Sequence, residues 1–218
     1  MNKFIIILCL LSFSCSDNNI VEPDLEIPSI DNSEIYISFH HSSIGIFSKH
    51  EVISDDFRIN NQNIPIDEWI TSESEFGGIT YISSSDIPSS IEYSPGNDLS
   101  FELQINEMLF EGVIELPYKP ELDWPVLNFD KPLDVSWSLV KSPEIQNLWV
   151  QFVDNTLDYT IAESWFLDGD IRKKTISREY FKHLDENSII YLMHIECRNY
   201  VVVGNNVALA SSLVVKYY

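Results

Sequence analysis

The sequence predicts an all-β protein built from two β-sandwich modules. Apolar and polar side chains alternate with period two through most of the chain, which is the pattern of strands that bury one face. In residues 101–106, Phe101, Leu103 and Ile105 fall on one face and the polar residues between them fall on the other. Stretches with helical spacing are few, and 44% apolar residues are enough for a packed core.

A proline-rich stretch interrupts this strand pattern near the middle of the chain. Four prolines fall within sixteen residues: Pro117, Pro120, Pro125 and Pro132. Because proline cannot donate to a ladder of hydrogen bonds, we expect this segment to lie outside the sheets. It divides the mature chain into an N-terminal β-sandwich module over residues 33–118 and a C-terminal β-sandwich module over residues 119–218.

Several segments on either side of the prolines carry the composition of strands. In the first module these are residues 34–41 and 77–85, and residues 99–116 predict a hairpin closed by a tight polar turn. In the second module they are residues 133–140, 147–155, 158–167, 188–203 and 207–218. Residues 175–184 are the one stretch suited to a short helix or helical turn, with Ser177 as its N-cap.

The alternation also assigns individual side chains to faces. In the long strand, Cys197 shares a face with Tyr191, Met193 and Ile195, whereas His194, Glu196 and Arg198 point the other way. We therefore expect Cys197 to be a buried core thiol. By the same logic Trp149 points away from the apolar face of its strand, and Trp165 lies beside the turn at Asp168.

The chain begins with the features of a signal peptide, over residues 1–14. Lys3 supplies a positive start, and an apolar run of about ten residues follows. That run is too short to cross a bilayer as a helix, which takes about 20 residues. The run stops at Cys15, after the small residue Ser14, and the chain then turns polar.

The residues "LSFSC" that end at Cys15 resemble the lipobox of bacterial lipoproteins. That resemblance implies that the Cys15 thiol carries a lipid and that residues 15–32 form an acidic tether. Ser16 after the cysteine is similar to signals that permit transfer to the outer membrane, so we expect a lipid-anchored protein of the cell outer membrane, facing the surface or the periplasm. The alternatives for Cys15 are an ordinary cleaved signal peptide and a core cysteine. The tether acids are typical of surface display, or of a segment that charge keeps extended.

The strand order over residues 126–218 resembles that of fibronectin type III-like and other immunoglobulin-like sandwiches. In that resemblance Trp137 occupies the core position of an early strand. Residues 191–199 would match a strand near the C-terminal end of the domain. The expected fold is thus two immunoglobulin-like β-sandwich modules after a lipoprotein signal and a short tether.

Charge and motifs exclude several classes of function. With 34 acidic residues against 13 Lys and Arg, the formal net charge is −21, which disfavours nucleic-acid binding. The chain has neither a G-x-S-x-G nucleophile elbow nor a Gly-rich phosphate loop. The five histidines show no ligand spacing, and the acids around Asp168 and Asp154 are turns rather than a calcium loop. We therefore expect no cofactor, no metal and no enzymatic activity.

Three functions remain open from the sequence. The first is a non-catalytic binding or assembly role in the cell envelope, with a membrane anchor at Cys15 and an envelope protein as partner. The second is glycan binding for a nutrient-uptake system, with Trp149 and Trp165 as the ligand-binding aromatics. The third is a hydrolase that uses an unrecognised pair of carboxylates, whose separation in space the sequence does not give.

Overall fold

The prediction of an all-β sandwich fold is confirmed. A computed structural model describes residues 27–28, 32–40, 43–73, 79–123, 125–154, 159–182, 184 and 189–217, and these ranges form fifteen β-strands, a short 3₁₀ helix and turns. The signal peptide and Cys15 lie outside the described residues. The strands form three sheets, of eight, four and three strands.

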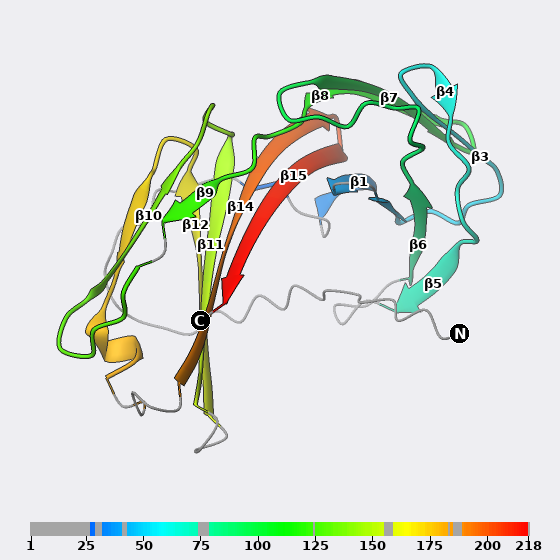
Figure 1. Cartoon of the computed structure of the whole chain (residues 1–218). Helices are drawn as coiled ribbons and strands as arrows, with labels where there is room; N and C mark the ends of the chain where they lie inside the picture. The colour runs from blue at the N-terminus through cyan, green and yellow to red at the C-terminus, as the bar shows by residue number, and fades with distance from the viewer. Residues whose placement is uncertain are drawn as a thin grey trace.

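The eight-stranded sheet is the largest of the three sheets and curves like an arch (Figure 1). Its strands, in spatial order, are β12 (Tyr159–Asp168), β11 (Ile145–Asp154), β14 (Ile189–Val203), β15 (Asn206–Tyr217), β1 (Ile35–His40), β2 (Ser43–Ser48), β6 (Ile79–Asp86) and β5 (Ile70–Glu73). Neighbours are antiparallel except for β1, which runs parallel to β15. The sheet therefore joins strands from both ends of the chain.

The two smaller sheets pack on the outside of this arch, and each closes a hydrophobic core. The four-stranded sheet is β4 (Gln62–Asn63), β3 (Asp55–Ile59), β7 (Asp98–Ile105) and β8 (Met108–Glu115). The three-stranded sheet is β13 (Lys173–Ile176), β10 (Leu133–Ser138) and β9 (Glu121–Asp123). The first covers β15, β1 and β2, and the second covers β12, β11 and β14.

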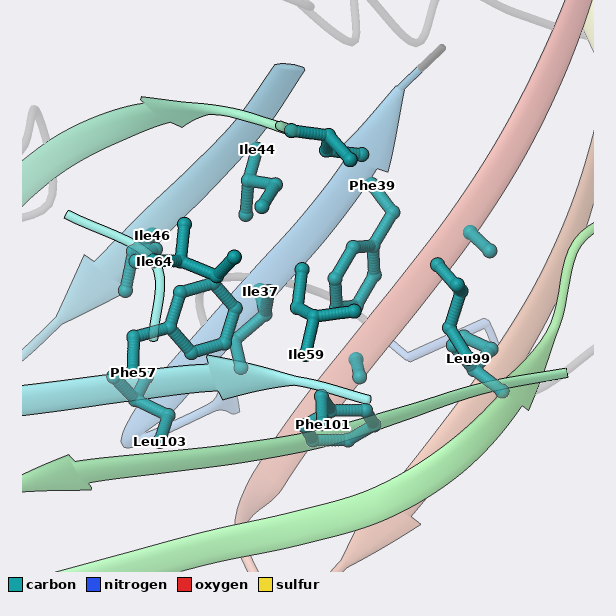
Figure 2. Close-up of a cluster of buried hydrophobic side chains, with 14 of the residues drawn as sticks. Ile37, Phe39, Ile44, Ile46, Phe57, Ile59, Ile64, Leu99, Phe101 and Leu103 are labelled. Carbon is teal, nitrogen blue, oxygen red and sulfur yellow. The ribbon is translucent and has the colours of Figure 1, made fainter. Parts of the chain in front are cut away.

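The first core is rich in isoleucine and phenylalanine (Figure 2). Phe57 on β3, Phe101 on β7 and Phe39 on β1 all belong to this core, and the rings of Phe39 and Phe101 lie 5.7 Å apart. Ala208 and Ala210 from β15 complete this core. These side chains come from alternate positions of each strand, which is why the period-two pattern was visible in the sequence.

The second core surrounds Trp137 on β10, which is 3% exposed. Its indole Nε1 donates a hydrogen bond of 2.6 Å to Oε1 of the buried Gln146. The Gln146 amide in turn donates to the backbone oxygens of Asp168, Gly169 and Ile171. This network ties β10, β11 and the turn after β12 together, so Trp137 is a core residue as expected.

The hairpin formed by β14 and β15 contributes to both cores. Tyr191, Met193 and Ile195 of β14 face the second core, whereas Val201 and the alanines of β15 pack in the first. The predicted boundary between residues 118 and 119 falls in the connection from β8 to β9, where the chain passes from one core to the other. The last two strands of the C-terminal part thus complete the N-terminal part.

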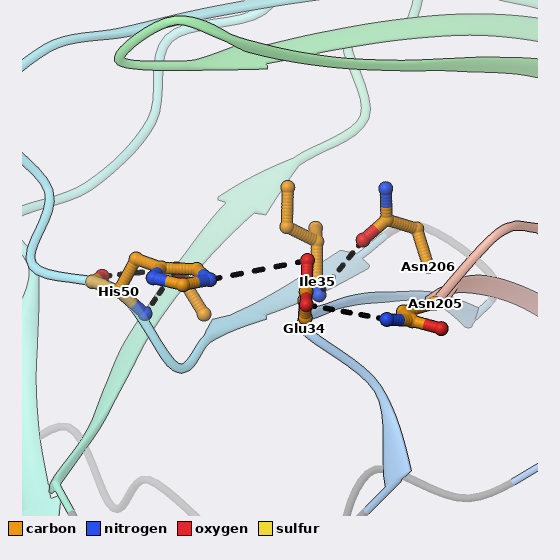
Figure 3. A network of polar contacts seen from close by, with 6 residues as sticks. Glu34, Ile35, His50, Asn205 and Asn206 are labelled. Carbon is orange, nitrogen blue, oxygen red and sulfur yellow. Dashed lines mark hydrogen bonds and ion pairs between the residues drawn. The ribbon is translucent and has the colours of Figure 1, made fainter.

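The start of β1 is held to this hairpin by a polar network (Figure 3). The backbone N–H of Ile35 donates to Oδ1 of Asn206 at 3.2 Å, and Asn205 Nδ2 donates to the Glu34 carboxylate at 3.2 Å. His50, just after β2, lies 4.0 Å from the same carboxylate. The segment that follows the predicted tether is therefore fixed where it enters the sheet.

Local predictions from the sequence have mixed outcomes. The hairpin over residues 99–116 is confirmed as β7 and β8, with Asn106 at a positive φ of 55° in the turn. The helical turn is confirmed as a 3₁₀ helix at Arg178–Tyr180, where the Ser177 side chain accepts from the Glu179 N–H. The expectation that the proline segment avoids the sheets is wrong for β9, because three residues between Pro120 and Pro125 suffice for an edge strand beside β10.

Candidate functional site

The two tryptophans singled out from the sequence lie on opposite faces of the eight-stranded sheet. Trp149 on β11 lies opposite Ser164 on β12 and His194 on β14. Trp165 on β12 lies opposite Leu148 on β11, whose side chain is in the second core. Trp165 is half-buried, with the Lys174 Nζ 5.3 Å from its ring centroid. Two indoles on opposite faces do not form one platform, so Trp149 is the one that faces away from the cores.

The face of the eight-stranded sheet opposite both cores is here named the concave face, because it lines the inside of the arch (Figure 1). A row of apolar side chains crosses six strands on this face, namely Val202, Val207, Tyr36, Phe47, Ile82 and Ile70. Val207 and Tyr36 are buried, Phe47 and Ile82 are half-buried, and the two ends of the row, Val202 and Ile70, are 56% and 55% exposed. Ile27, from the segment before β1, packs against the buried middle.

Beside the apolar row lies a buried ion pair between Arg198 and Glu196. The Arg198 Nη2 donates to the Glu196 carboxylate at 2.6 Å, and the two side chains are only 8% and 12% exposed. The guanidinium carbon also stands 5.4 Å from the centroid of the Phe166 ring. Burial works to lower the pKa of Arg198, but the Glu196 carboxylate and the Tyr200 hydroxyl together outweigh burial, so the pKa is raised and the guanidinium stays charged.

Among the described residues, two polar atoms of this cluster form no hydrogen bond of regular geometry, although the two side chains that carry them interact with each other. They are the Arg198 Nε and the Tyr200 hydroxyl, in residues whose overall exposure is 6% and 8%. Burial raises the pKa of Tyr200 and of the neighbouring Tyr36, so both phenols stay protonated and able to donate. Buried donors without a well-formed hydrogen bond are uncommon in folded proteins, and these mark the centre of the concave face as a candidate binding site.

Trp149 forms a stacked pair with His194 on the same face. The ring centroids lie 5.1 Å apart with an interplanar angle of 21°. Burial lowers the pKa of His194, Arg198 lowers it further, and Glu196 opposes them, so the imidazole is neutral near pH 7. The neighbouring side chains on β12 are the small, exposed Ala162 and Ser164.

A polar line runs from Arg198 to its neighbours on the next two strands. Arg198 pairs with Ser211 on β15, and Ser211 pairs with His40 on β1. The Ser211 Oγ and the His40 Nδ1 form a hydrogen bond. These contacts link the C-terminal hairpin to β1 across the centre of the concave face.

Sequence reasoning placed His194, Glu196 and Arg198 on one face but did not identify them as a site. It did not single out Tyr36 or Tyr200, and it treated His40 only as one of five scattered histidines. Alternation along a strand gives the face of each residue, whereas the strand that lies next to it depends on pairing between distant segments. The pairing of β1 with β15 brings Tyr36 beside Val207, and no local sequence pattern predicts this pairing.

Other sequence predictions concern cysteine and oxygen-rich turns. Cys197 is fully buried, as expected, and burial raises its pKa to about 12. The Asp168 carboxylate accepts from the Asp170 N–H at 3.1 Å, which is the local turn bond that Asp favours. In the ranges that the structure describes, no group of three or more His, Cys, Asp or Glu side chains is placed to hold a metal ion.

No helix among the described residues is both long enough and apolar enough to span a bilayer. Comparisons with known protein families and with curated proteins found no match for this chain. The candidate site on the concave face is therefore argued from its own residues alone.

Proposed function

We propose that the chain is a lipid-anchored protein of the cell envelope that binds a partner and does not act as a catalyst. The concave face of the eight-stranded sheet is the proposed binding surface. The observation that carries the proposal is the apolar row on this face, which neither small sheet covers and which is exposed at Val202 and Ile70. Exposed apolar side chains at both ends of a buried apolar cluster are the surface on which this proposal depends, because exposed apolar patches often mark interaction sites.

The anchor belongs to this proposal through the resemblance of residues 11–15 to a lipobox. Cys15 would carry the lipid, and the acidic tether would connect it to β1. The immunoglobulin-like affiliation of the two parts and the location in the outer membrane are also part of the proposal, supported by the leading segment and the all-β architecture. Metabolic labelling with a fatty acid tests the anchor: label is expected on the full chain and absent from a Cys15→Ala variant.

Site-specific photo-cross-linking in cells tests the binding surface. A photoreactive residue is placed at Val202 on the concave face or, as control, at Val113 on the outer side of β8. The two positions are matched, with side chains 56% and 57% exposed. We expect a discrete adduct from position 202 and none from position 113. Equal adducts from both positions, or none from either, would contradict the concave face as the binding surface.

A glycan is the second candidate ligand, because Trp149 has small, exposed neighbours on β12 that leave room beside its ring. Sugar rings stack on indoles, and His194 would hold the Trp149 ring in place. On a glycan array, binding is expected for the unaltered chain, lost for Trp149→Ala and kept for Trp165→Phe, which lies on the other face. An array without signal from the unaltered chain would remove this candidate.

A further inference from the structure

The strand β12 is a long and uninterrupted edge of the eight-stranded sheet. Among the described strands β11 is its one hydrogen-bonded neighbour, and the two pair at ten consecutive positions with no bulge. The opposite edge, β5, has four residues, and the short edges β4, β9 and β13 have two, three and four. The other long edge, β8, packs against β14, where Gly112 meets Val201.

A free edge presents unpaired backbone N–H and C=O groups, and proteins usually protect such edges with lysine, proline or a bulge. The β12 sequence, YTIAESWFLD, contains no lysine, arginine or proline. Glu163 is the one charged residue within positions 161–167, and it is half-buried on the side of the second core. Burial raises its pKa, so a nearby cation would stabilise its charged form. Apart from Glu163, this edge is suited to pairing with another strand.

We propose that β12 pairs antiparallel with β12 of a second copy of this chain, about a two-fold axis at Ser164, so that two eight-stranded sheets become one. An axis that is perpendicular to the sheet and passes midway between the two opposed Ser164 residues keeps the concave faces of both copies on the same side. This inference goes beyond the proposed function, because it depends on the edge of the sheet and not on the concave face.

The β12 sequence is self-complementary in this register. The cross-strand pairs are Phe166 with Ala162, Leu167 with Ile161, and Trp165 with Glu163. The large Phe166 ring thus meets the smallest side chain of the strand, and two aliphatic side chains meet on the other face. Cross-strand pairs of this kind stabilise antiparallel strands.

The same register neutralises Glu163. The Lys174 Nζ lies 5.3 Å from the centroid of the Trp165 ring, and Trp165 is the residue opposite Glu163 of the second copy. Each copy therefore brings a cation to the one acid in the pairing segment. An axis at Glu163 would instead oppose two identical acids, and an axis at Trp165 would place Leu167 against Glu163, so both neighbouring registers are disfavoured.

The net charge of −21 opposes the approach of two copies at long range. At physiological ionic strength this repulsion is screened over about 8 Å. The local pairs at the edge then decide whether the strands join, and these are complementary.

Cysteine cross-linking in cells tests the register with the full chain. Directly opposed residues in antiparallel strands have Cα atoms about 4.5–5.5 Å apart, within the range of a disulfide. Ser164→Cys places the two new thiols, one from each copy, directly opposite each other across the proposed axis. Ala162→Cys, also exposed and on the same face, places two thiols roughly 13 Å apart, since four residues separate them along the strand.

With a mild oxidant, we expect Ser164→Cys to give a reducible band at twice the monomer mass. Ala162→Cys and the unaltered chain should give none; the latter controls for the native thiols, among which Cys197 is buried. Absence of the band from Ser164→Cys, or an equal band from Ala162→Cys, overturns the proposal.

A charge exchange tests the contact between Lys174 and Glu163. Two differently tagged copies of the full chain are co-purified from gently solubilised membranes. Glu163→Lys or Lys174→Glu should lower recovery roughly tenfold, because each places like charges together at the edge. The double variant carrying both changes should restore recovery. A double variant that associates no better than either single variant overturns the proposed contact, whatever the result for binding at the concave face.

Discussion

At the scale of single residues, the concave face holds polar groups at a depth where most proteins place apolar side chains. Arg198 and Glu196 neutralise each other, and Phe166 covers the guanidinium. Burying two charges is costly, and the cost is offset only while both partners are present. Such a pair is weak as a source of stability but strongly destabilising when broken, and this asymmetry makes its role measurable.

Replacing Glu196 alone should destabilise the fold strongly. In Glu196→Ala the Arg198 charge stays buried without its partner, and the expected loss in the free energy of unfolding is about 3–5 kcal/mol. Removing both charges, as in Glu196→Leu/Arg198→Met, should cost much less. Chemical denaturation of the four members of this double-mutant cycle measures the difference. If the double variant is as unstable as Glu196→Ala, the pair is not coupled as the structure implies.

The lowered pKa of His194 predicts that the stability of the fold depends on pH. Burial lowers its folded-state pKa below the usual value, so the unfolded state binds more protons in this range. The stability contributed by neutral His194 is thus present above the unfolded pKa of about 6.5 and lost as pH falls through the folded pKa. Unfolding free energies measured at about pH 7.5 and 5.5 should decrease toward the lower pH, and His194→Phe, which keeps a ring against Trp149, should show a smaller decrease. An unchanged decrease in the variant would assign the effect to other groups.

At the scale of secondary-structure elements, the contact between β8 and the C-terminal hairpin depends on a glycine. A Cβ atom added at Gly112 would come within 2.9 Å of the Phe101 ring and 3.0 Å of the Val201 side chain. The neighbouring Val113 points outward and is 57% exposed. Gly112 therefore lets the four-stranded sheet approach β14 closely.

Adding a methyl group at Gly112 should separate these elements. Overpacking of this kind typically costs about 1–3 kcal/mol, so Gly112→Ala is expected to lower the free energy of unfolding by that amount. Val113→Ala, one residue away on the exposed side, should change it by less than about 0.5 kcal/mol. Thermal or denaturant unfolding distinguishes the two variants, and equal effects would show that the β8–β14 contact is not tightly packed.

The elements also show what the sequence could predict. Alternation assigned both faces of β14 correctly, because the face of a residue depends only on its position along its own strand. The turn of the β7–β8 hairpin was visible for the same local reason. The proline rule was wrong for β9, since it does not exclude a three-residue edge strand between two prolines. The sequence suggested that Trp149 and Trp165 could bind one glycan together, but the register of β11 with β12 places them on opposite faces of the sheet.

At the scale of the whole molecule, the pairing of β1 with β15 could not be predicted locally. Ile35 and Asn206 are paired although 171 residues separate them, and no motif in either strand specifies the other. The candidate site could not be predicted for the same reason, because only that pairing brings Tyr36 and His40 close to Arg198 and Tyr200. Long-range strand pairing thus creates the part of the concave face that sequence reasoning missed.

This pairing leads to a prediction for the two parts of the chain. A fragment of residues 33–118 keeps β1 but loses β15, which is its parallel neighbour and supplies Ala208 and Ala210 to the first core. One full side of β1 would be left as an open edge, and the contact of Gly112 with Val201 would be lost. We expect this fragment to lack a cooperative unfolding transition by circular dichroism, whereas the full chain unfolds in one transition.

The fragment of residues 119–218 provides the comparison. It retains all the strands of the second core, so any loss of its structure would come from the exposed first-core side of β15 and from the lost contacts with β1 and β8. We expect it to be partly ordered and less stable than the same strands in the full chain. Cooperative unfolding of residues 33–118 alone, at a midpoint similar to that of the full chain, would show instead that the boundary at residue 118 separates two independent modules and that the shared hairpin adds little to the first.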